Sequence, residues 1–159
     1  MNGLREIDKL RYLIQCVQRE GNNRFAHLLQ AKGLDITPSQ SEVITVLSEF
    51  GSMSIAELGE LLLCNSQHPS RLVRRLLDKD YIIKENSKDD SRKVIISLTE
   101  KGKLLSKEVS QMEQLFNEEI ASKIAASNIN LQDLNSLFAN QISETTSESK
   151  IANRFGSDN

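Results

Sequence analysis

The fold of the chain is decided by the stretch Asp89-Asp90-Ser91-Arg92-Lys93-Val94-Ile95-Ile96-Ser97-Leu98-Thr99-Glu100-Lys101-Gly102. Its charged beginning lies between two β-type runs, residues 81–85 and 94–98, which predicts a hairpin with a polar tip. Just upstream, residues 66–79 carry apolar side chains at helical spacing, which predicts an amphipathic helix with its basic residues on the outer side. A helix followed directly by a basic hairpin is one arrangement that reads DNA.

The composition favours a helical protein with an aliphatic core. Hydrophobic residues make up 38% of the 159 residues and aromatic residues only 4%, so Leu and Ile have to supply most of the packing between helices. This length is sufficient for one domain with its own core, or for a small domain with helical extensions. No apolar run approaches the ~18 residues that span a bilayer, so we expect a protein that binds no membrane. Two widely spaced cysteines without a CxxC motif make a reducing cytoplasm the simplest setting.

The cysteines and histidines indicate neither a disulfide framework nor a metal site. Cys16 and Cys64 lie far apart without a CxxC motif, and His27 and His68 have no carboxylate or cysteine at ligand spacing. The sequence also offers no credible set of nucleophile, base and orienting group. We predict no bound metal or cofactor and no enzymatic activity.

Positive charge is concentrated in one segment. Residues 66–103 carry ten Lys and Arg residues against six acidic residues, a net charge of +4, whereas the whole chain has a net charge of −2. The rest of the chain is therefore acidic, with a net charge of −6. Acidic flanks limit indiscriminate binding to polyanions, so residues 66–103 are the ones we expect to contact a nucleic acid.

Capping signals predict where the helices of the central segment begin. Thr37-Pro38-Ser39-Gln40 places Thr at the N-cap and Pro at the first helical position, and Ser54-Ile55-Ala56-Glu57 is a capping box. Phe50 is expected on the buried face of the first of these helices. Ser66 is the preferred N-cap of the next helix, because the missing N–H of Pro69 then costs no helical hydrogen bond.

Long helices are predicted at both ends of the chain. Apolar residues recur at helical spacing from residue 4 to about 32 with a suspected kink near Gly21, and Gly33 is expected to end that helix. Thr99 is predicted to cap a second long helix, and a last helix follows over residues 131–142. Terminal helices with a sustained apolar seam and no other element left to cover them suggest a dimer.

This organisation predicts a mainly α protein with a small β-hairpin wing. The fold is a winged helix-turn-helix, residues 35–102, with N- and C-terminal dimerisation helices at residues 1–34 and 103–145. From Ser143 onward the chain is rich in Ser, Thr, Glu and Asn with few hydrophobic residues, which predicts a disordered tail over residues 146–159.

A winged helix-turn-helix inserts the start of its recognition helix into the major groove, where the base edges are distinguishable. The residues predicted to read bases are Ser66, Gln67, His68, Ser70 and Arg71. The residues predicted to contact phosphates are Arg74, Arg75 and Lys79. The residues predicted to form the working part of the wing are Lys88, Asp90, Arg92 and Lys93. Arg92 is expected beside the minor groove, where narrow A·T tracts attract arginine, and Asp90 is expected to orient Arg92 or an arginine of the recognition helix.

These motifs resemble the MarR family of bacterial transcription regulators over residues 4 to about 142. The most specific match is Asp90-Ser91-Arg92 followed by Ile96-Ser97-Leu98-Thr99-Glu100-Lys101-Gly102, which looks like the family's Asp-x-Arg wing and the entry to its dimer helix. Thr37-Pro38-Ser39-Gln40 and Ser70-Arg71-Leu72-Val73 also fit, in family order. The resemblance implies an obligate homodimer that binds a palindromic operator, commonly as a repressor relieved by a small molecule or by oxidation.

Two positions depart from the family pattern. His68-Pro69 replaces the small or β-branched pair that usually begins the recognition helix, and Ser91 stands where a second wing arginine is common. The first departure affects the geometry of the first helical turn and its base preference. The second should weaken the contacts of the wing.

The resemblance also implies places for a regulatory ligand or an oxidation. Some family members bind aromatic acids or phenols between the dimer helices and the DNA-binding lobe, and the candidates here are Arg11, Tyr12 and Arg19, whose more ordinary role is dimer packing. Some members sense peroxides through a cysteine of the first helix, which makes Cys16 a redox candidate. Cys64, in an apolar position ahead of the recognition helix, is a second candidate, although most buried cysteines are inert hydrophobic residues. Two alternatives stay open: a redox-sensing winged-helix dimer, and a winged-helix module that binds a ligand or a protein instead of DNA.

Overall fold

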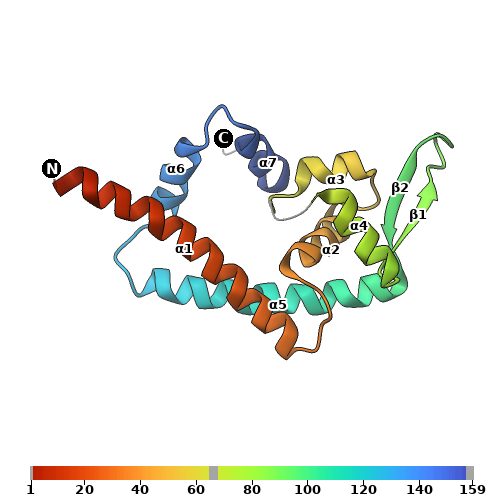
Figure 1. Cartoon of the computed structure of the whole chain (residues 1–159), viewed down its shortest axis with the longest axis horizontal. Helices are drawn as coiled ribbons and strands as arrows, with labels where there is room; N and C mark the ends of the chain where they lie inside the picture. Colours follow the sequence, from red (N-terminus) through yellow and green to blue (C-terminus); the bar gives the residue numbers. More distant parts are fainter. Residues whose placement is uncertain (1, 65–67, 157–159) are drawn as a thin grey trace. The chain divides into compact units, whose positions relative to one another are not determined.

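The computed structural model describes residues 2–64 and 68–156. Within them the chain forms helices and one two-stranded antiparallel sheet (Figure 1). The helices are α1 (Asn2–Ala31), α2 (Pro38–Phe50), α3 (Ile55–Leu61), α4 (Pro69–Asp78), α5 (Glu100–Ala125), α6 (Leu131–Gln141) and α7 (Thr146–Phe155), and the strands are β1 (Ile82–Asn86) and β2 (Val94–Leu98). The chain divides into two compact units, residues 1–38 and 39–159, and each is described by itself.

The first unit consists mainly of α1, which continues through Gly21 without a break. Gly33 ends this helical segment with a φ of +79°, a conformation that glycine adopts without a steric penalty. Its N–H donates to the carbonyl of Gln30 (2.9 Å), and the N–H of Leu34 donates to the carbonyl of Leu29 (3.0 Å). The predicted glycine cap is confirmed, and the helix is not interrupted at Gly21.

The second unit has an aliphatic core, as the composition predicted. The side chains that are at most 1% exposed include Val43, Ile44, Leu58, Leu72, Val73, Leu76, Ile82, Ile96 and Val109. The prediction that Phe50 joins this core is wrong, since its side chain is 44% exposed. Phe50 is the last residue of α2, and the chain turns away at Gly51, which has a φ of +81°.

The starts of α2 and α3 agree with the capping signals in the sequence. α2 begins at Pro38. Before α3, the N–H of Ser54 donates to Oε2 of Glu57 (2.7 Å) and the N–H of Glu57 donates to Oγ of Ser54 (3.1 Å), which completes the predicted capping box.

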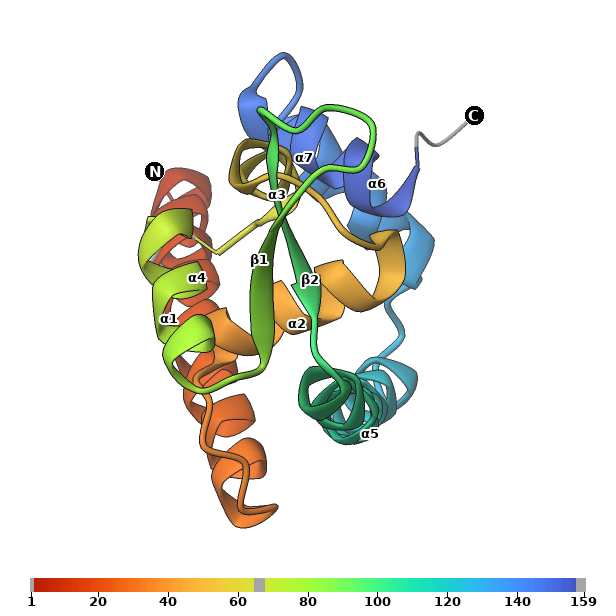
Figure 2. The ribbon, with the colours of Figure 1, turned by 90° about the vertical axis from the view of Figure 1, so that its right-hand side faces the viewer.

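The predicted hairpin is formed by β1 and β2, paired from Ile82 opposite Leu98 to Asn86 opposite Val94. The strands lie side by side and extend to a loop at their far end (Figure 2). A single residue before α3 adds to the base of the sheet, because Met53 exchanges both backbone hydrogen bonds with Ile96. Of the strand residues, Ile82 and Ile96 are buried and most of the others are exposed, so these two side chains supply most of the apolar packing of the hairpin against the core.

The hairpin passes into α5 through a tight junction. Thr99 caps α5 as predicted, since its Oγ1 accepts the N–H of Gly102 (3.0 Å) and donates to the carbonyl of Asp80 (2.7 Å). Gly102 is buried, and a Cβ at this position would lie 2.0 Å from the carbonyl oxygen of Tyr81. Only glycine leaves room for this approach of the helix to the backbone before β1.

The prediction of a disordered tail from residue 146 onward is wrong for residues 146–156, which the structure describes. Thr146–Phe155 forms α7, with Thr145 as N-cap accepting the N–H of Glu148 (3.4 Å). α7 lies alongside α3 in Figure 1, and the two helices are in contact. Its polar residues bind a part of the chain about 90 or more residues earlier, a kind of contact that low hydrophobicity does not reveal. Residues 157–159 lie outside the described residues.

Candidate nucleic-acid interface

The start of α4 differs from the sequence prediction. His68 is the N-cap, with φ −63° and ψ 137°, and Pro69 is the first helical residue. The prediction of Ser66 as N-cap is wrong because proline disfavours the helical conformation in the residue before it, so His68 cannot lie inside the helix. Ser66 and Gln67, two of the predicted base-reading residues, lie outside the described residues.

The other predicted base-reading residues, His68, Ser70 and Arg71, lie together at the N-terminus of α4 and are exposed. The carbonyl of His68 accepts the N–H of Arg71 (2.9 Å), which fixes the first turn. The first turn contains no acidic residue. Free N–H groups and the helix dipole therefore favour an anion such as phosphate near this end.

The basic side chains of α4 are held outward by its apolar face. Leu72, Val73 and Leu76 are at most 1% exposed, and helical geometry turns the residues between them toward solvent. Arg74 and Arg75 are exposed, and Lys79 after the helix is partly exposed. The exposed surface of α4 therefore carries the basic residues Arg71, Arg74 and Arg75, with the acidic Asp78 at its C-terminal end.

The wing residues lie in the loop between β1 and β2 and at its end. Lys88, Asp90, Arg92 and Lys93 are all exposed. Asp90 Oδ1 accepts the backbone N–H of Arg92 (3.0 Å), and the carbonyl of Asp90 accepts the N–H of Lys93 (2.9 Å). Asp90 thus shapes the backbone that carries Arg92, and its role in orienting an arginine side chain stays a prediction.

The wing also contacts α3 through Glu57, a residue that the sequence analysis predicted only as part of a capping box. Nζ of Lys93 lies 3.6 Å from Oε1 of Glu57, whose other oxygen belongs to the capping box. Hydrogen bonds from Ser54, and then the charge of Lys93, lower the pKa of Glu57. Because both side chains are more than half exposed, the pair contributes little to stability, but it links the wing to the helix that precedes the recognition helix.

The base of the wing carries a second contact that sequence reasoning missed. Nζ of Lys101 donates to the carbonyl of Lys79 (2.8 Å) and lies 4.6 Å from the centre of the Tyr81 ring. The lysine therefore joins the end of the recognition helix to the start of α5. This role of Lys101 could not be predicted from the sequence, because its partners Lys79 and Tyr81 lie 20 or more positions earlier in the chain.

The predicted effector residues Arg11, Tyr12 and Arg19 lie on α1 and are exposed. Arg11 pairs with Asp8 (2.7 Å) and its guanidinium lies 6.0 Å from the Tyr12 ring, whereas Arg19 approaches Glu20 (3.4 Å) and Sγ of Cys16 (3.7 Å). These contacts are all local to the helix. A ligand site at these residues stays a prediction.

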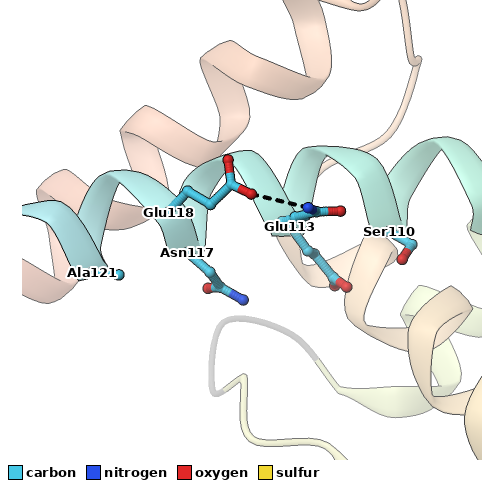
Figure 3. Close-up of a pocket in the computed structure, with 6 residues that line it drawn as sticks. Ser110, Glu113, Asn117, Glu118 and Ala121 are labelled. Atoms are coloured by element: carbon cyan, nitrogen blue, oxygen red, sulfur yellow. Dashed lines mark hydrogen bonds between the residues drawn. The ribbon is translucent and has the colours of Figure 1, made fainter.

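A surface depression is found instead on one face of α5 (Figure 3). It is lined by Ser110, Glu113, Gln114, Asn117, Glu118 and Ala121. Burial raises the pKa of Glu113, which also accepts a hydrogen bond from Thr45 of α2 (2.8 Å). Gln114 donates to Glu118 (2.9 Å). Two carboxylates and no cation make this lining unsuitable for an acidic aromatic ligand.

The two redox candidates lie in different surroundings. Cys16 is exposed on α1, whereas Cys64 is half-buried beside Glu42 of α2, whose Oε2 accepts its backbone N–H (3.0 Å). Burial, with the carboxylate of Glu42 adding to it, raises the pKa of the Cys64 thiol to about 12. The thiolate is the reactive form, so this environment opposes oxidation of Cys64.

We therefore expect Cys64 to resist alkylation in the folded protein. In a Cys16→Ser variant, which retains only Cys64, iodoacetamide at pH 8 should react on the order of 100-fold more slowly than with the same chain unfolded in urea. The Cys64→Ser variant, which retains the exposed Cys16, is the matched control and should differ far less between the two conditions. Equal rates for folded and unfolded Cys64 would contradict the buried, protonated thiol.

Among residues 2–64 and 68–156, no group of three or more His, Cys, Asp or Glu side chains is arranged to hold a metal ion. In the same part of the chain, no helix is both long and apolar enough to cross a membrane.

Known proteins resemble the chain in both sequence and structure. The model of the family described as transcriptional regulator SarA/Rot matches residues 27–109, which include α4 and the whole hairpin. The HTH-type transcriptional regulator SarZ of Staphylococcus aureus (strain MRSA252) is 28% identical over 122 residues, which cover 76% of this chain and 81% of SarZ.

Solved structures share the fold. A MarR mutant from E. coli complexed with operator DNA matches with a TM-score of 0.67 and 22% identity, covering 86% of this chain and 93% of that chain. A MepR-like protein complexed with pseudoligands matches with a TM-score of 0.59 and 27% identity, covering 83% and 88%. The predicted MarR-type winged-helix fold is thereby confirmed.

Proposed function

Because this chain belongs to the SarA/Rot family of transcriptional regulators, we propose that it binds specific DNA sites as a homodimer and regulates transcription there. The site it reads is two-fold symmetric, since a symmetric dimer presents two copies of α4. The MarR relative was solved with operator DNA, which supports the same type of ligand for this fold.

One observation carries the proposal: the exposed, acid-free N-terminus of α4 and the basic wing belong to one module held by one core. An ordinary solvated helix surface would not be expected to have a second basic element attached to it. Leu72, Leu76 and Ile96, from the helix and the hairpin, are all fully buried. The two basic elements are therefore held by a packed core, as contact with one rigid ligand requires.

The parts of the module have different tasks in this proposal. His68, Ser70 and Arg71, together with Ser66 and Gln67, face base edges in the major groove, where Arg pairs with guanine and Gln with adenine. Arg74, Arg75 and Lys79 contact phosphates, which position the protein without specifying sequence. Arg92, on the backbone shaped by Asp90, lies beside the minor groove, flanked by Lys88 and Lys93.

The apolar residues of α1 support the homodimer. Leu4, Ile7, Leu10, Ile14 and Val17 are each between 44% and 77% exposed in the single chain. Contiguous exposed apolar surface of this kind indicates a protein interface. α6 also exposes apolar side chains, with Leu131 and Leu137 each 50% exposed. We assign these surfaces to a second copy of the chain.

We further propose that DNA binding represses transcription and that a small aromatic or phenolic effector relieves it. One structural neighbour is described as the multiple antibiotic resistance repressor MarR, and another was solved with pseudoligands. Arg11, Tyr12 and Arg19 are the candidate effector contacts. Cys16, exposed on α1, is the remaining candidate for the alternative of redox control.

Titration of the wild-type protein against labelled DNA at several salt concentrations tests the proposal. Fragments from the upstream region of its own gene are compared with scrambled fragments of equal composition. We expect selective binding whose log–log salt dependence has a slope of about −0.9 per phosphate neutralised. A flat salt response, or equal affinity for all fragments, would favour the module that binds a ligand or a protein instead of DNA.

Arg71→Ala should change which bases are preferred. Loss of a bidentate base contact costs about 1–3 kcal/mol at the position that Arg71 reads and leaves affinity for scrambled DNA nearly unchanged. Selection of bound sequences from random DNA, with wild type and variant side by side, measures this. Arg75→Ala is the control, because loss of a phosphate contact should lower the affinity for all DNA sequences by the same factor. Equal losses on all sequences in both variants would make Arg71 a phosphate contact.

A further inference from the structure

The helix α7 is fastened to the C-terminus of α3 by polar side chains. Lys150 Nζ donates to the carbonyl of Leu62 (3.1 Å), Arg154 donates to the carbonyl of Leu61 (3.4 Å), and Asn153 donates to the carbonyl of Glu60 (3.4 Å). The last carbonyls of a helix lack partners within the helix and carry the negative end of its dipole. Two cations and an amide of α7 therefore complete the end of α3.

Glu42 of α2 is the centre of this junction. Its Oε1 accepts the N–H of Leu63 (2.7 Å) and its Oε2 accepts the N–H of Cys64 (3.0 Å), the last two described residues before His68. Nη1 of Arg154 lies 3.1 Å from the same Oε1. One carboxylate thus joins the backbone that leaves α3 to a side chain of the C-terminal helix.

This ion pair is enclosed, unlike the other ion pairs described above. The side chain of Arg154 is 9% exposed and that of Glu42 is 18% exposed. Removing one member of a buried pair leaves the other charge without compensation. The carboxylate of Glu42 should therefore hold the Leu63 and Cys64 amides firmly only while Arg154 is in place.

α3 in turn lies against the start of the recognition helix. The two helices are in contact, and a Cβ on Gly59 would lie 3.6 Å from Cγ of Pro69, the first residue of α4. A shift at the end of α3 is therefore transmitted to the turn that presents His68, Ser70 and Arg71.

We propose that α7 positions the recognition helix, with Arg154 acting through Glu42 on the backbone of Leu63 and Cys64. The inference rests on the proposed DNA-binding function and adds the C-terminal helix to the determinants of its sequence selectivity. Arg154 touches no DNA in this account. Its effect is on base reading, which needs an accurately placed helix, and not on the general attraction to phosphates.

Arg154→Leu in the full-length protein is the principal test. Affinity for a fragment obtained by selection from random DNA should fall about tenfold, the size of effect expected when one base contact is lost. Affinity for a scrambled fragment should fall less than about twofold. Hydrogen exchange of the Leu63 and Cys64 amides should accelerate, because their acceptor is no longer held. Lys123→Leu, which removes an exposed cation from α5, controls for the lost charge and should show none of these changes.

A second pair of variants keeps the test informative if Arg154→Leu folds poorly. Arg154→Lys retains the charge and should restore part of the selectivity, whereas Glu42→Gln in the full-length chain removes the charge of the other partner and should behave like Arg154→Leu. Unchanged selectivity, higher affinity in either variant, or parallel losses on both fragments together with a lower melting temperature would each overturn the positioning role. Absence of selective binding by the wild type would instead refute the proposed function, and the amide exchange would still report on the junction.

Discussion

Replacing Gly102 by alanine should lower the free energy of unfolding by about 3 kcal/mol or more. The new Cβ would lie 2.0 Å from the carbonyl oxygen of Tyr81, far inside van der Waals contact, and 3.2 Å from Cδ2 of Leu98. Overpacking of a buried position typically costs about 1–3 kcal/mol, and here the obstacle is backbone that cannot rotate away. Urea denaturation followed by circular dichroism measures the change.

Gly3→Ala is the matched control for this substitution. Gly3 also lies in a helix, but a Cβ there would have no neighbour within 4 Å. Alanine favours the helix over glycine by up to about 1 kcal/mol, so this variant should be at least as stable as wild type. A Gly102→Ala protein of wild-type stability would mean that the junction between the wing and α5 is looser than described.

The double variant Leu10→Glu/Ile14→Glu should be monomeric and should lose most of its DNA affinity. The two residues are 45% and 44% exposed in the single chain, and in a dimer interface their carboxylates would be buried at a cost of several kcal/mol. A monomer binds only one half-site, so it lacks the increase in affinity that comes from binding two linked half-sites at once. Its DNA affinity should therefore be lower by about 100-fold or more. Light scattering gives the mass, and DNA titration gives the affinity.

Gln15→Glu/Gln18→Glu adds the same charge at two exposed polar residues of α1 and serves as the control. This variant should remain dimeric and should bind DNA with nearly wild-type affinity. A dimeric Leu10→Glu/Ile14→Glu protein with undiminished affinity would show that the apolar residues of α1 do not hold the two copies together.

Local chemistry explains which parts of the fold could be predicted from sequence. The capping box at Ser54, the cap at Thr99 and the glycine cap at Gly33 are interactions between residues a few positions apart, so short motifs reveal them. The start of α4 was misplaced because two local rules compete at Pro69. The missing N–H of proline permits an earlier cap, but its ring excludes a helical residue before it.

The remaining features depend on contacts between distant parts of the chain. Glu42 binds the backbone 21 and 22 positions later and Arg154 112 positions later, and no pattern in the sequence connects these residues. The low hydrophobicity of residues 146–159 suggested disorder, because a helix fastened by Lys and Arg to the end of another helix has little apolar signature. The exposed positions of the basic residues of α4 could be predicted because the apolar residues of the same helix fix the direction of each side chain.

The most direct test of the account is the symmetry of the DNA that the wild-type protein selects from a random pool. Two copies of α4 reading successive major grooves predict an inverted repeat whose half-sites are centred about 10 base pairs apart. Such a repeat, bound by one dimer, is the expected result. A single asymmetric motif, or no enriched sequence at all, would contradict the reading of DNA by a symmetric pair of winged helices.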